Sequence, residues 1–83
     1  MATREQLLAV LLGDDFTDAE KTVVIWQFGL TGDFQKALWE AIVKADDLYL
    51  LKLSFGFPEE VAGYLAWTRG DLGRRLQAAG LEI

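Results

Sequence analysis

The chain contains no cysteine and no histidine. Their absence excludes disulfide bonds and thiolate nucleophiles, and it removes the commonest zinc ligands and the usual acid–base group at neutral pH. Ser54 is the only serine, and no histidine is present to activate its hydroxyl. The glycines match neither the phosphate-binding loop of nucleotide hydrolases nor the dinucleotide-binding fingerprint. We therefore expect a protein that is not an enzyme and that binds no cofactor.

Acidic residues occur in four neighbouring pairs, each at a place where a helix is expected to begin. Two carboxylates are able to hydrolyse glycosidic bonds or to hold a divalent metal. At a helix start, however, capping of backbone N–H groups and the helix dipole account for them. We expect neither a catalytic nor a metal site at these pairs, which are Asp14/Asp15, Asp18/Glu20, Asp46/Asp47 and Glu59/Glu60.

Basic residues are scarce, because eight lysines and arginines face thirteen aspartates and glutamates, and the net charge is −5. This balance argues against a nucleic-acid partner, since binding to phosphates needs positive charge. The sequence has no run of about 18 apolar residues, the length that a membrane-spanning helix needs. The apolar run over residues 7–12 lacks the basic leader of a signal peptide. We expect no membrane contact and a cytoplasmic location.

Arg69, Arg74 and Arg75 form the one basic cluster, near the end of a predicted helix. One interpretation is a solvated face, because cations are favoured at the negative end of a helix dipole. The other is a contact with a phosphate or an acidic partner. The second interpretation leads to an alternative function, a small DNA-associated regulator of helix-turn-helix type that uses this C-terminal cluster.

What the sequence does have is apolar residues, at 52% of its 83 positions. Its length corresponds to one domain over residues 1–83. Apolar periodicity and glycine or proline punctuation predict an all-α fold, a compact domain of five to six short helices joined by Gly/Pro turns. The helices are expected over residues 4–12, 18–28, 33–45, 47–55, from 58 to the region of 68, and 71–79.

Residues 22–28 are the ambiguous stretch of this prediction. Their β-branched and aromatic side chains favour a strand. No other part of the sequence would supply a partner strand, so we predict a helix here too.

Helix ends are strongly specified by local signals. Such signals satisfy backbone groups at a helix terminus or fix its backbone angle there. They are two capping boxes (Thr3 with Gln6, and Thr17 with Glu20), a proline at the first position of a helix (Pro58), and a Schellman ending after Gly80 in which Leu76 contacts Leu81.

The helix over residues 33–45 has one apolar stripe with the spacing of a buried face. The stripe consists of Phe34, Ala37, Leu38, Ala41, Ile42 and Ala45. Trp39 and Val43 lie roughly 120° from its centre at 100° per residue. In the helix that begins at Pro58, the expected inward face is Val61, Tyr64, Leu65 and Thr68, and Trp67 lies roughly 110° from the Val61/Leu65 line by the same geometry.

The chain has more apolar surface than six short helices cover easily, because residues 23–28 and 48–55 are apolar almost all round. One interpretation makes one of these helices the central element, with Trp39 half-covered by the terminal helices. The other assigns part of the surface to a protein interface, where tryptophan and tyrosine are favoured anchors. The second predicts a non-catalytic interaction module that pairs with itself as a homodimer or with another protein. Its candidate contact residues are Trp39, Val43, Tyr49 and Trp67.

Several segments spread over most of the chain carry a resemblance. They are Thr17-Asp18-Ala19-Glu20, Val24-Ile25-Trp26-Gln27-Phe28, Gly32-Asp33-Phe34, Ala37-Leu38-Trp39, Gly56-Phe57-Pro58-Glu59-Glu60-Val61, Trp67 and Gly80-Leu81. Together they resemble small acidic helical proteins of unassigned role encoded by bacteriophages. The resemblance implies a protein made in the cytoplasm of a bacterial host, acting as a phage accessory or host-defence inhibitor that binds a host or phage protein. It assigns no role to any single residue.

Overall fold

The computed structural model describes residues 3–81, and its regular structure in this range is entirely helical. This confirms the predicted all-α fold, a compact single domain. Residues 22–27 are helical, so the strand alternative for this stretch is wrong. The helices are α1 (Arg4–Leu12), α2 (Asp18–Gln27), α3 (Asp33–Lys44), α4 (Asp47–Gly56), α5 (Pro58–Arg69) and α6 (Leu72–Ala78).

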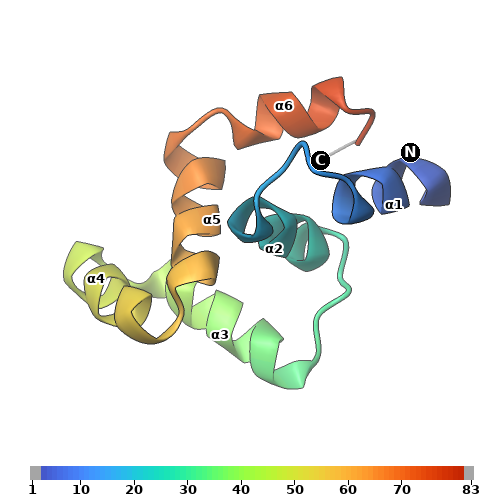
Figure 1. The fold of residues 1–83 in the computed structure, drawn as a ribbon. Coiled ribbons are helices and arrows are strands. Elements are labelled where there is room, and N and C mark those ends of the chain that lie inside the picture. The colour runs from blue at the N-terminus through green and yellow to red at the C-terminus, as the bar shows by residue number, and fades with distance from the viewer. Residues whose placement is uncertain (1–2, 82–83) are drawn as a thin grey trace.

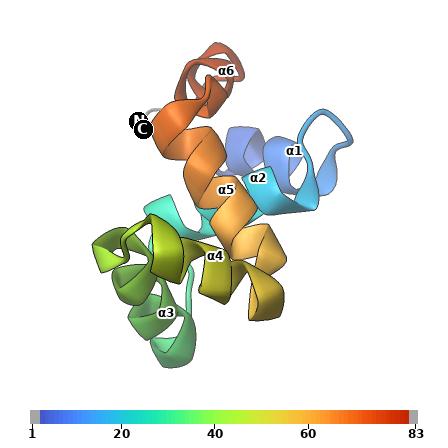
Figure 2. The same ribbon diagram turned by 90° about the vertical axis from the view of Figure 1, so that its left-hand side faces the viewer.

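Helix α5 runs through the middle of the molecule and connects its two ends. Helices α1 and α6 lie at one end, α3 and α4 lie at the other, and α2 packs across α5 between them (Figure 1). The view turned by 90° shows the same division (Figure 2). The α2–α5 pair makes the most extensive contact between helices, whereas α4 packs mainly against α5.

The helix ends follow the local signals in the sequence. Both predicted capping boxes are present, at Thr3/Gln6 and at Thr17/Glu20. Pro58 occupies the first turn of α5, where its missing N–H leaves no hydrogen bond unmade. The side chains of the two capping boxes accept from N–H donors that have no partner within their own helix.

Two helices end in Schellman motifs at glycines. Each glycine has a positive φ, a backbone angle that residues with a side chain rarely adopt. After α6, Gly80 has φ 96°, and the Leu81 N–H donates to the Leu76 carbonyl at 3.0 Å. This is the Schellman ending that the sequence predicts, and Leu76 and Leu81 are both buried. Gly29 at φ 70° ends α2 in the same way.

The predicted buried stripe of α3 is rotated from the one in the structure. Trp39 is only 1% exposed, whereas Phe34 is 69% exposed and two of the three alanines of the stripe, Ala37 and Ala41, face solvent. Leu38 and Ile42 are buried, as predicted. The rotation follows from the stacking of Trp39 on Trp26, with ring centroids 4.4 Å apart and planes 1° from parallel. Burying a large ring releases more apolar surface from water than burying two alanines does.

Helix α5 is covered on two sides, whereas the sequence predicts a single inward face. Val61 is buried and Leu65 is half-buried, as predicted, but Thr68 is exposed. The opposite side of the helix, with Gly63 buried and Trp67 half-buried, also packs in the interior. The reason is that α5 lies between α4 and α2, so neighbours reach it from two directions.

Gly63 allows α2 and α5 to cross closely. A Cβ atom built at Gly63 would overlap the Ala19 carbonyl oxygen and would lie 2.9 Å from the Val23 Cγ2 atom. The carbonyl belongs to the backbone of α2, so it moves only if the two helices separate. The crossing therefore depends on the absence of a side chain at this position.

We predict that Gly63→Ala lowers the free energy of unfolding by about 1–3 kcal/mol, as overpacking does. This effect opposes the gain of about 1 kcal/mol that alanine brings to a helix interior. Gly56→Ala is the matched control, because a Cβ there meets nothing within 4 Å. Urea unfolding measures both. A Gly63→Ala protein as stable as the control would contradict the close crossing.

Candidate protein interface

Helix α4 leaves one apolar face without a cover. Leu50 is buried against the rest of the protein, but Leu48 and Leu51 are each 57% exposed and Phe55 is 81% exposed. These three positions are spaced i, i+3 and i+7, so they lie on one side of the helix, turned away from Leu50. We call Leu48, Leu51 and Phe55 the α4 face. Helix α4 lies at the edge of the molecule (Figure 1), and the three side chains of this face are exposed.

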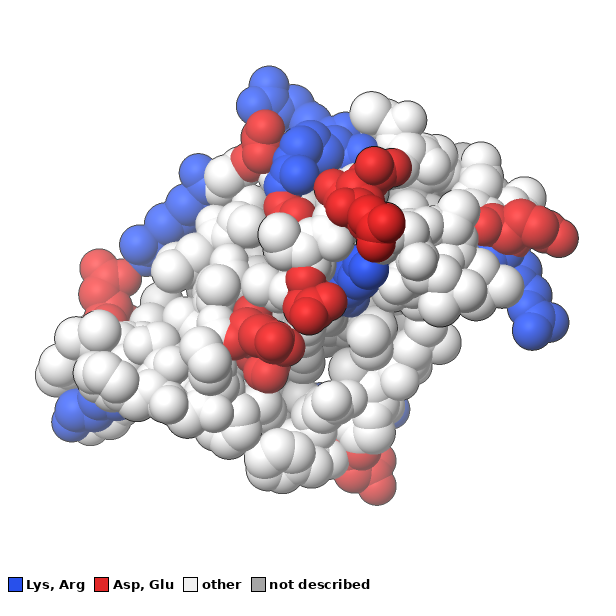
Figure 3. Space-filling view, in the orientation of Figure 1, with Lys and Arg blue, Asp and Glu red and all other residues white. Residues whose placement is uncertain are grey.

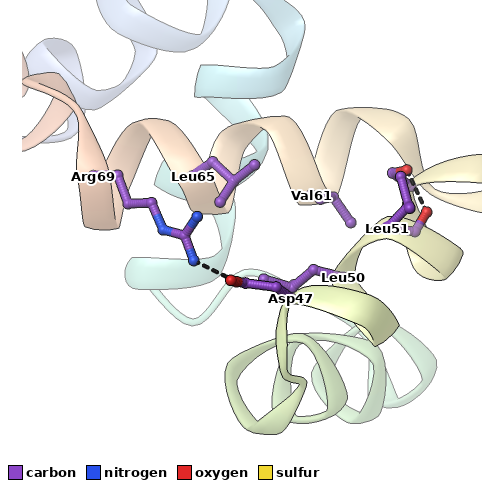
Figure 4. A pocket seen from close by; sticks show the side chains of 7 residues that line it. Asp47, Leu50, Leu51, Val61, Leu65 and Arg69 are labelled. Atoms are coloured by element: carbon purple, nitrogen blue, oxygen red, sulfur yellow. Dashed lines mark hydrogen bonds and ion pairs between the residues drawn. The ribbon is translucent and has the colours of Figure 1, made fainter.

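A groove of about 230 Å³ runs between α4 and α5 beside this face. Its walls are mainly apolar, and Leu51 belongs both to the groove and to the α4 face. The Ser54 hydroxyl, also in the wall, donates to the Leu51 carbonyl of its own helix at 2.5 Å. Figure 4 shows the side chains of the two helices facing each other across this α4–α5 groove. The lining residues are Asp47, Leu50, Leu51, Ser54, Val61, Leu65 and Arg69.

An ion pair closes one end of the α4–α5 groove. The Arg69 guanidinium donates to the Asp47 carboxylate at 2.8 Å (Figure 4). This hydrogen bond and the charge of Asp47 raise the pKa of Arg69 above its ordinary value. Both side chains are largely exposed, so the pair adds little to stability. Its effect is to neutralise the charges at the end of the groove.

The surface around α4 carries few charges. Figure 3 shows acidic and basic side chains spread over this side of the molecule, with a mainly uncharged area at the lower left that has a few charged side chains at its edges. The one lysine of α4, Lys52, lies 5.0 Å from the centre of the Tyr49 ring. A cation over an aromatic face is held by the ring quadrupole. Among the acidic side chains at the start of α4, Asp47 is paired with Arg69, whereas Asp46 caps the helix and has no ion pair within residues 3–81.

The sequence-predicted contact residues fall into three environments. Trp39 is buried under Trp26, so the prediction that it is a surface anchor is wrong. Trp67 is half-buried and packs against the core, and a Cβ at Gly73 would lie 3.4 Å from its ring. Val43 on α3 and Tyr49 on α4 are both exposed. Tyr49 is thus the predicted residue that lies on the helix of the candidate interface.

Sequence reasoning did not select the three residues of the α4 face. The signal was present, because residues 48–55 are apolar almost all round and a helix of this kind needs cover on every side. Which side stays open depends on where α5 packs, and the sequence of α4 alone does not contain that information.

A second, smaller hollow of about 140 Å³ lies over the tryptophan stack. Its walls are almost wholly apolar and include Val43, one of the predicted contact residues. The lining residues are Trp26, Trp39, Glu40, Val43 and Lys44. This hollow is smaller than the α4–α5 groove, and a lysine and a glutamate side chain flank it.

The arginine cluster is mostly engaged within the protein. Arg75 pairs with Glu20, a buried carboxylate of α2, and with Asp71 at 3.2 Å. Arg69 pairs with Asp47, as described above. Arg74 is exposed, and no ion pair joins it to another residue of the described part. Within residues 3–81 the cluster thus offers one guanidinium without an ion pair, where the sequence presented three.

Glu20 has two roles at the start of α2. One carboxylate oxygen accepts from the Thr17 N–H at 2.9 Å, which completes the capping box. The other accepts from Arg75, which joins α6 to α2. A buried carboxylate needs such partners, because burying an unpaired charge is costly. Of the predicted acid pairs, Asp18/Glu20 therefore has a structural role.

Among residues 3–81, no group of three or more acidic side chains is arranged to hold a metal ion. In the same range, no helix has the length and apolar content to cross a bilayer. Comparison with models of protein families, with curated proteins and with solved structures found no match to this chain. The function has to be inferred from the residues themselves.

We predict that Arg75→Met lowers the free energy of unfolding by about 1–3 kcal/mol, because Glu20 then stays buried without its cation. Methionine keeps much of the apolar stem of arginine, so the loss reports the charge. Arg74→Met is the control, and an exposed position of this kind changes stability by about 0.5 kcal/mol or less. Urea unfolding measures both variants. Equal free energies of unfolding for the two variants would show that the buried carboxylate of Glu20 does not need Arg75 as a partner.

Proposed function

We propose that the protein is a non-catalytic protein–protein interaction module whose contact surface is the α4 face with the adjoining α4–α5 groove. The observation that carries this proposal is the exposure of three large apolar side chains at helical spacing beside an apolar recess. Exposed apolar patches of a few hundred Å² on soluble proteins commonly mark interaction sites. Burial of an anchor side chain in a recess is also the usual arrangement at the centre of an interface.

The energetics fit an interaction surface. Fully burying a leucine or phenylalanine side chain contributes about 1.5–3 kcal/mol. The side chains of the α4 face are already partly covered, so docking a partner gains less than this from each. Binding in the micromolar range requires about 8 kcal/mol. The α4 face would therefore be the central anchor of a larger contact, with residues such as Tyr49 at its rim.

The biological setting of this proposal comes from the sequence resemblance to small acidic bacteriophage proteins. In that setting the module is a phage accessory or host-defence inhibitor that acts by binding in the bacterial cytoplasm. The alternative function, a DNA-associated regulator, has less support. Arg69 and Arg75 are engaged with carboxylates of the same chain, so their charges are not available to phosphates without breaking those pairs.

We predict that Leu51→Glu abolishes partner binding without unfolding the protein. A carboxylate at this exposed position places a charge in the middle of the α4 face, and burying that charge against an apolar partner is costly. Leu12→Glu is the matched control, because Leu12 is also exposed but lies on α1. Tagged wild-type and variant proteins are used to capture proteins from a bacterial lysate.

The comparison between the two variants is the test. Proteins captured by the wild type and by Leu12→Glu, but not by Leu51→Glu, support the α4 face as the contact surface. Circular dichroism confirms that both variants keep their helices. Identical capture by both variants would place the contact surface elsewhere.

A further inference from the structure

The α4–α5 groove is walled by two helices that run in opposite directions. Figure 4 shows Arg69, Leu65 and Val61 following one another along α5, with Asp47 opposite Arg69 and Leu51 toward the Val61 end. One end of the groove therefore holds the Asp47–Arg69 ion pair, and the other lies where the chain passes from α4 into α5. We call these the ion-pair end and the turn end.

The walls of the groove offer few hydrogen-bonding groups to an occupant. Away from the helix ends, the backbone groups of both walls are bonded within their own helices. The Ser54 hydroxyl donates to the Leu51 carbonyl, and the Arg69 guanidinium donates to the Asp47 carboxylate. An extended peptide would bury backbone groups here without partners, which is costly. A helix carries its own backbone hydrogen bonds, so the groove favours a helix as its occupant.

The groove has the dimensions to receive apolar side chains of such a helix. Asp47 and Ser54, at its two ends on α4, are seven residues apart, which is about 10 Å at 1.5 Å per residue. This length matches apolar side chains at positions i, i+3 and i+7 of a partner helix. The groove volume of about 230 Å³ exceeds the roughly 150 Å³ that admits a benzene ring, so a large apolar side chain fits.

The charges around the groove are mainly negative. Asp46 at the start of α4 is exposed, and so is Glu59 in the first turn of α5, whereas its neighbour Glu60 is half-buried. None of these three carboxylates has an ion pair within residues 3–81. Lys52 is the one basic residue of α4. Since the ion-pair end is neutral in itself, the groove has acidic surroundings, and the whole chain carries a net charge of −5. Such a surface attracts a partner of positive charge.

We propose that the occupant of the α4–α5 groove is a basic amphipathic helix of a partner protein. Its apolar residues lie between α4 and α5, and its lysines or arginines lie beside Asp46 near the ion-pair end and beside Glu59 at the turn end. This inference rests on the proposed function and names the chemistry of the partner. The apolar contact supplies most of the affinity, and the charges select a basic helix over an acidic one.

The first test uses two synthetic peptides of about 15 residues, a length at which isolated helices begin to form. Both have leucines at helical spacing, and the other positions are lysine in one peptide and glutamate in the other. Fluorescence anisotropy of the dye-labelled peptides measures binding at about 0.1 M salt, where attraction beyond about 10 Å is screened. We expect the leucine–lysine peptide to bind about tenfold or more tightly than the leucine–glutamate peptide. Equal affinity for both, or no binding of the leucine–lysine peptide at millimolar protein, would overturn the proposal.

Leu51→Glu tests whether the leucine–lysine peptide binds in the groove. The change adds a negative charge, so it strengthens any unspecific attraction of a basic peptide, but it places a carboxylate in the apolar wall. We expect it to weaken binding about tenfold or more. Leu12→Glu on α1 makes the same charge change at an exposed leucine outside the groove, and we expect it not to weaken binding. Equal affinity of the two variants would place the peptide elsewhere and overturn the proposal.

Glu59→Lys tests the contact at the turn end. Glu59 is exposed and is the second residue of α5, and Glu5 is exposed and is the second residue of α1. Glu5→Lys is therefore matched in its charge change and in its position along a helix. We expect Glu59→Lys to weaken binding of the leucine–lysine peptide about three- to tenfold, and Glu5→Lys about twofold or less. Equal weakening by both would assign the attraction to the net charge of the chain and overturn the contact with Glu59.

The outcomes separate this inference from the proposed function. If Leu51→Glu loses the proteins captured from the lysate but the wild type does not distinguish the two peptides, the proposed function stands and the basic helix is excluded. If the wild type prefers the leucine–lysine peptide and Leu51→Glu weakens that binding, the inference stands whatever the lysate yields.

Discussion

The close crossing of α2 and α5 is the constraint on which the rest of the structure depends. At Gly63 the two backbones approach so closely that no side chain fits against the Ala19 carbonyl. Because interiors are packed at nearly crystal density, a contact of this kind fixes the relative position of both helices. Helix α5 then has one side occupied by α2, and the other elements attach around this pair.

The open face of α4 follows from that arrangement. With α2 on one side, α5 offers its Val61 and Leu65 side to α4, and Leu50 fills the space between them. A single neighbour covers only part of an apolar helix, so the side opposite Leu50 stays in contact with solvent. The same geometry that buries the core thus creates the candidate contact surface.

Features that depend on a few neighbouring residues were predictable from the sequence. The Thr17 capping box and the Gly80 ending involve residues at most five positions apart, and both are present. The rotation of α3 was not predictable, because it depends on the stacking of Trp39 on Trp26 of another helix. For the same reason the sequence pointed to Tyr49 but missed Phe55, since the side of α4 that stays open is decided by where α5 packs.

The ion pair between Glu20 and Arg75 affects the order in which the contacts of the fold form during synthesis. The two residues are 55 positions apart, and domains are made from the N-terminus onward. The start of α2 is translated with its carboxylate lacking a cation, and the arginine that pairs with it follows 55 residues later. The ion pair that joins α6 to α2 therefore forms only after residue 75 has been translated.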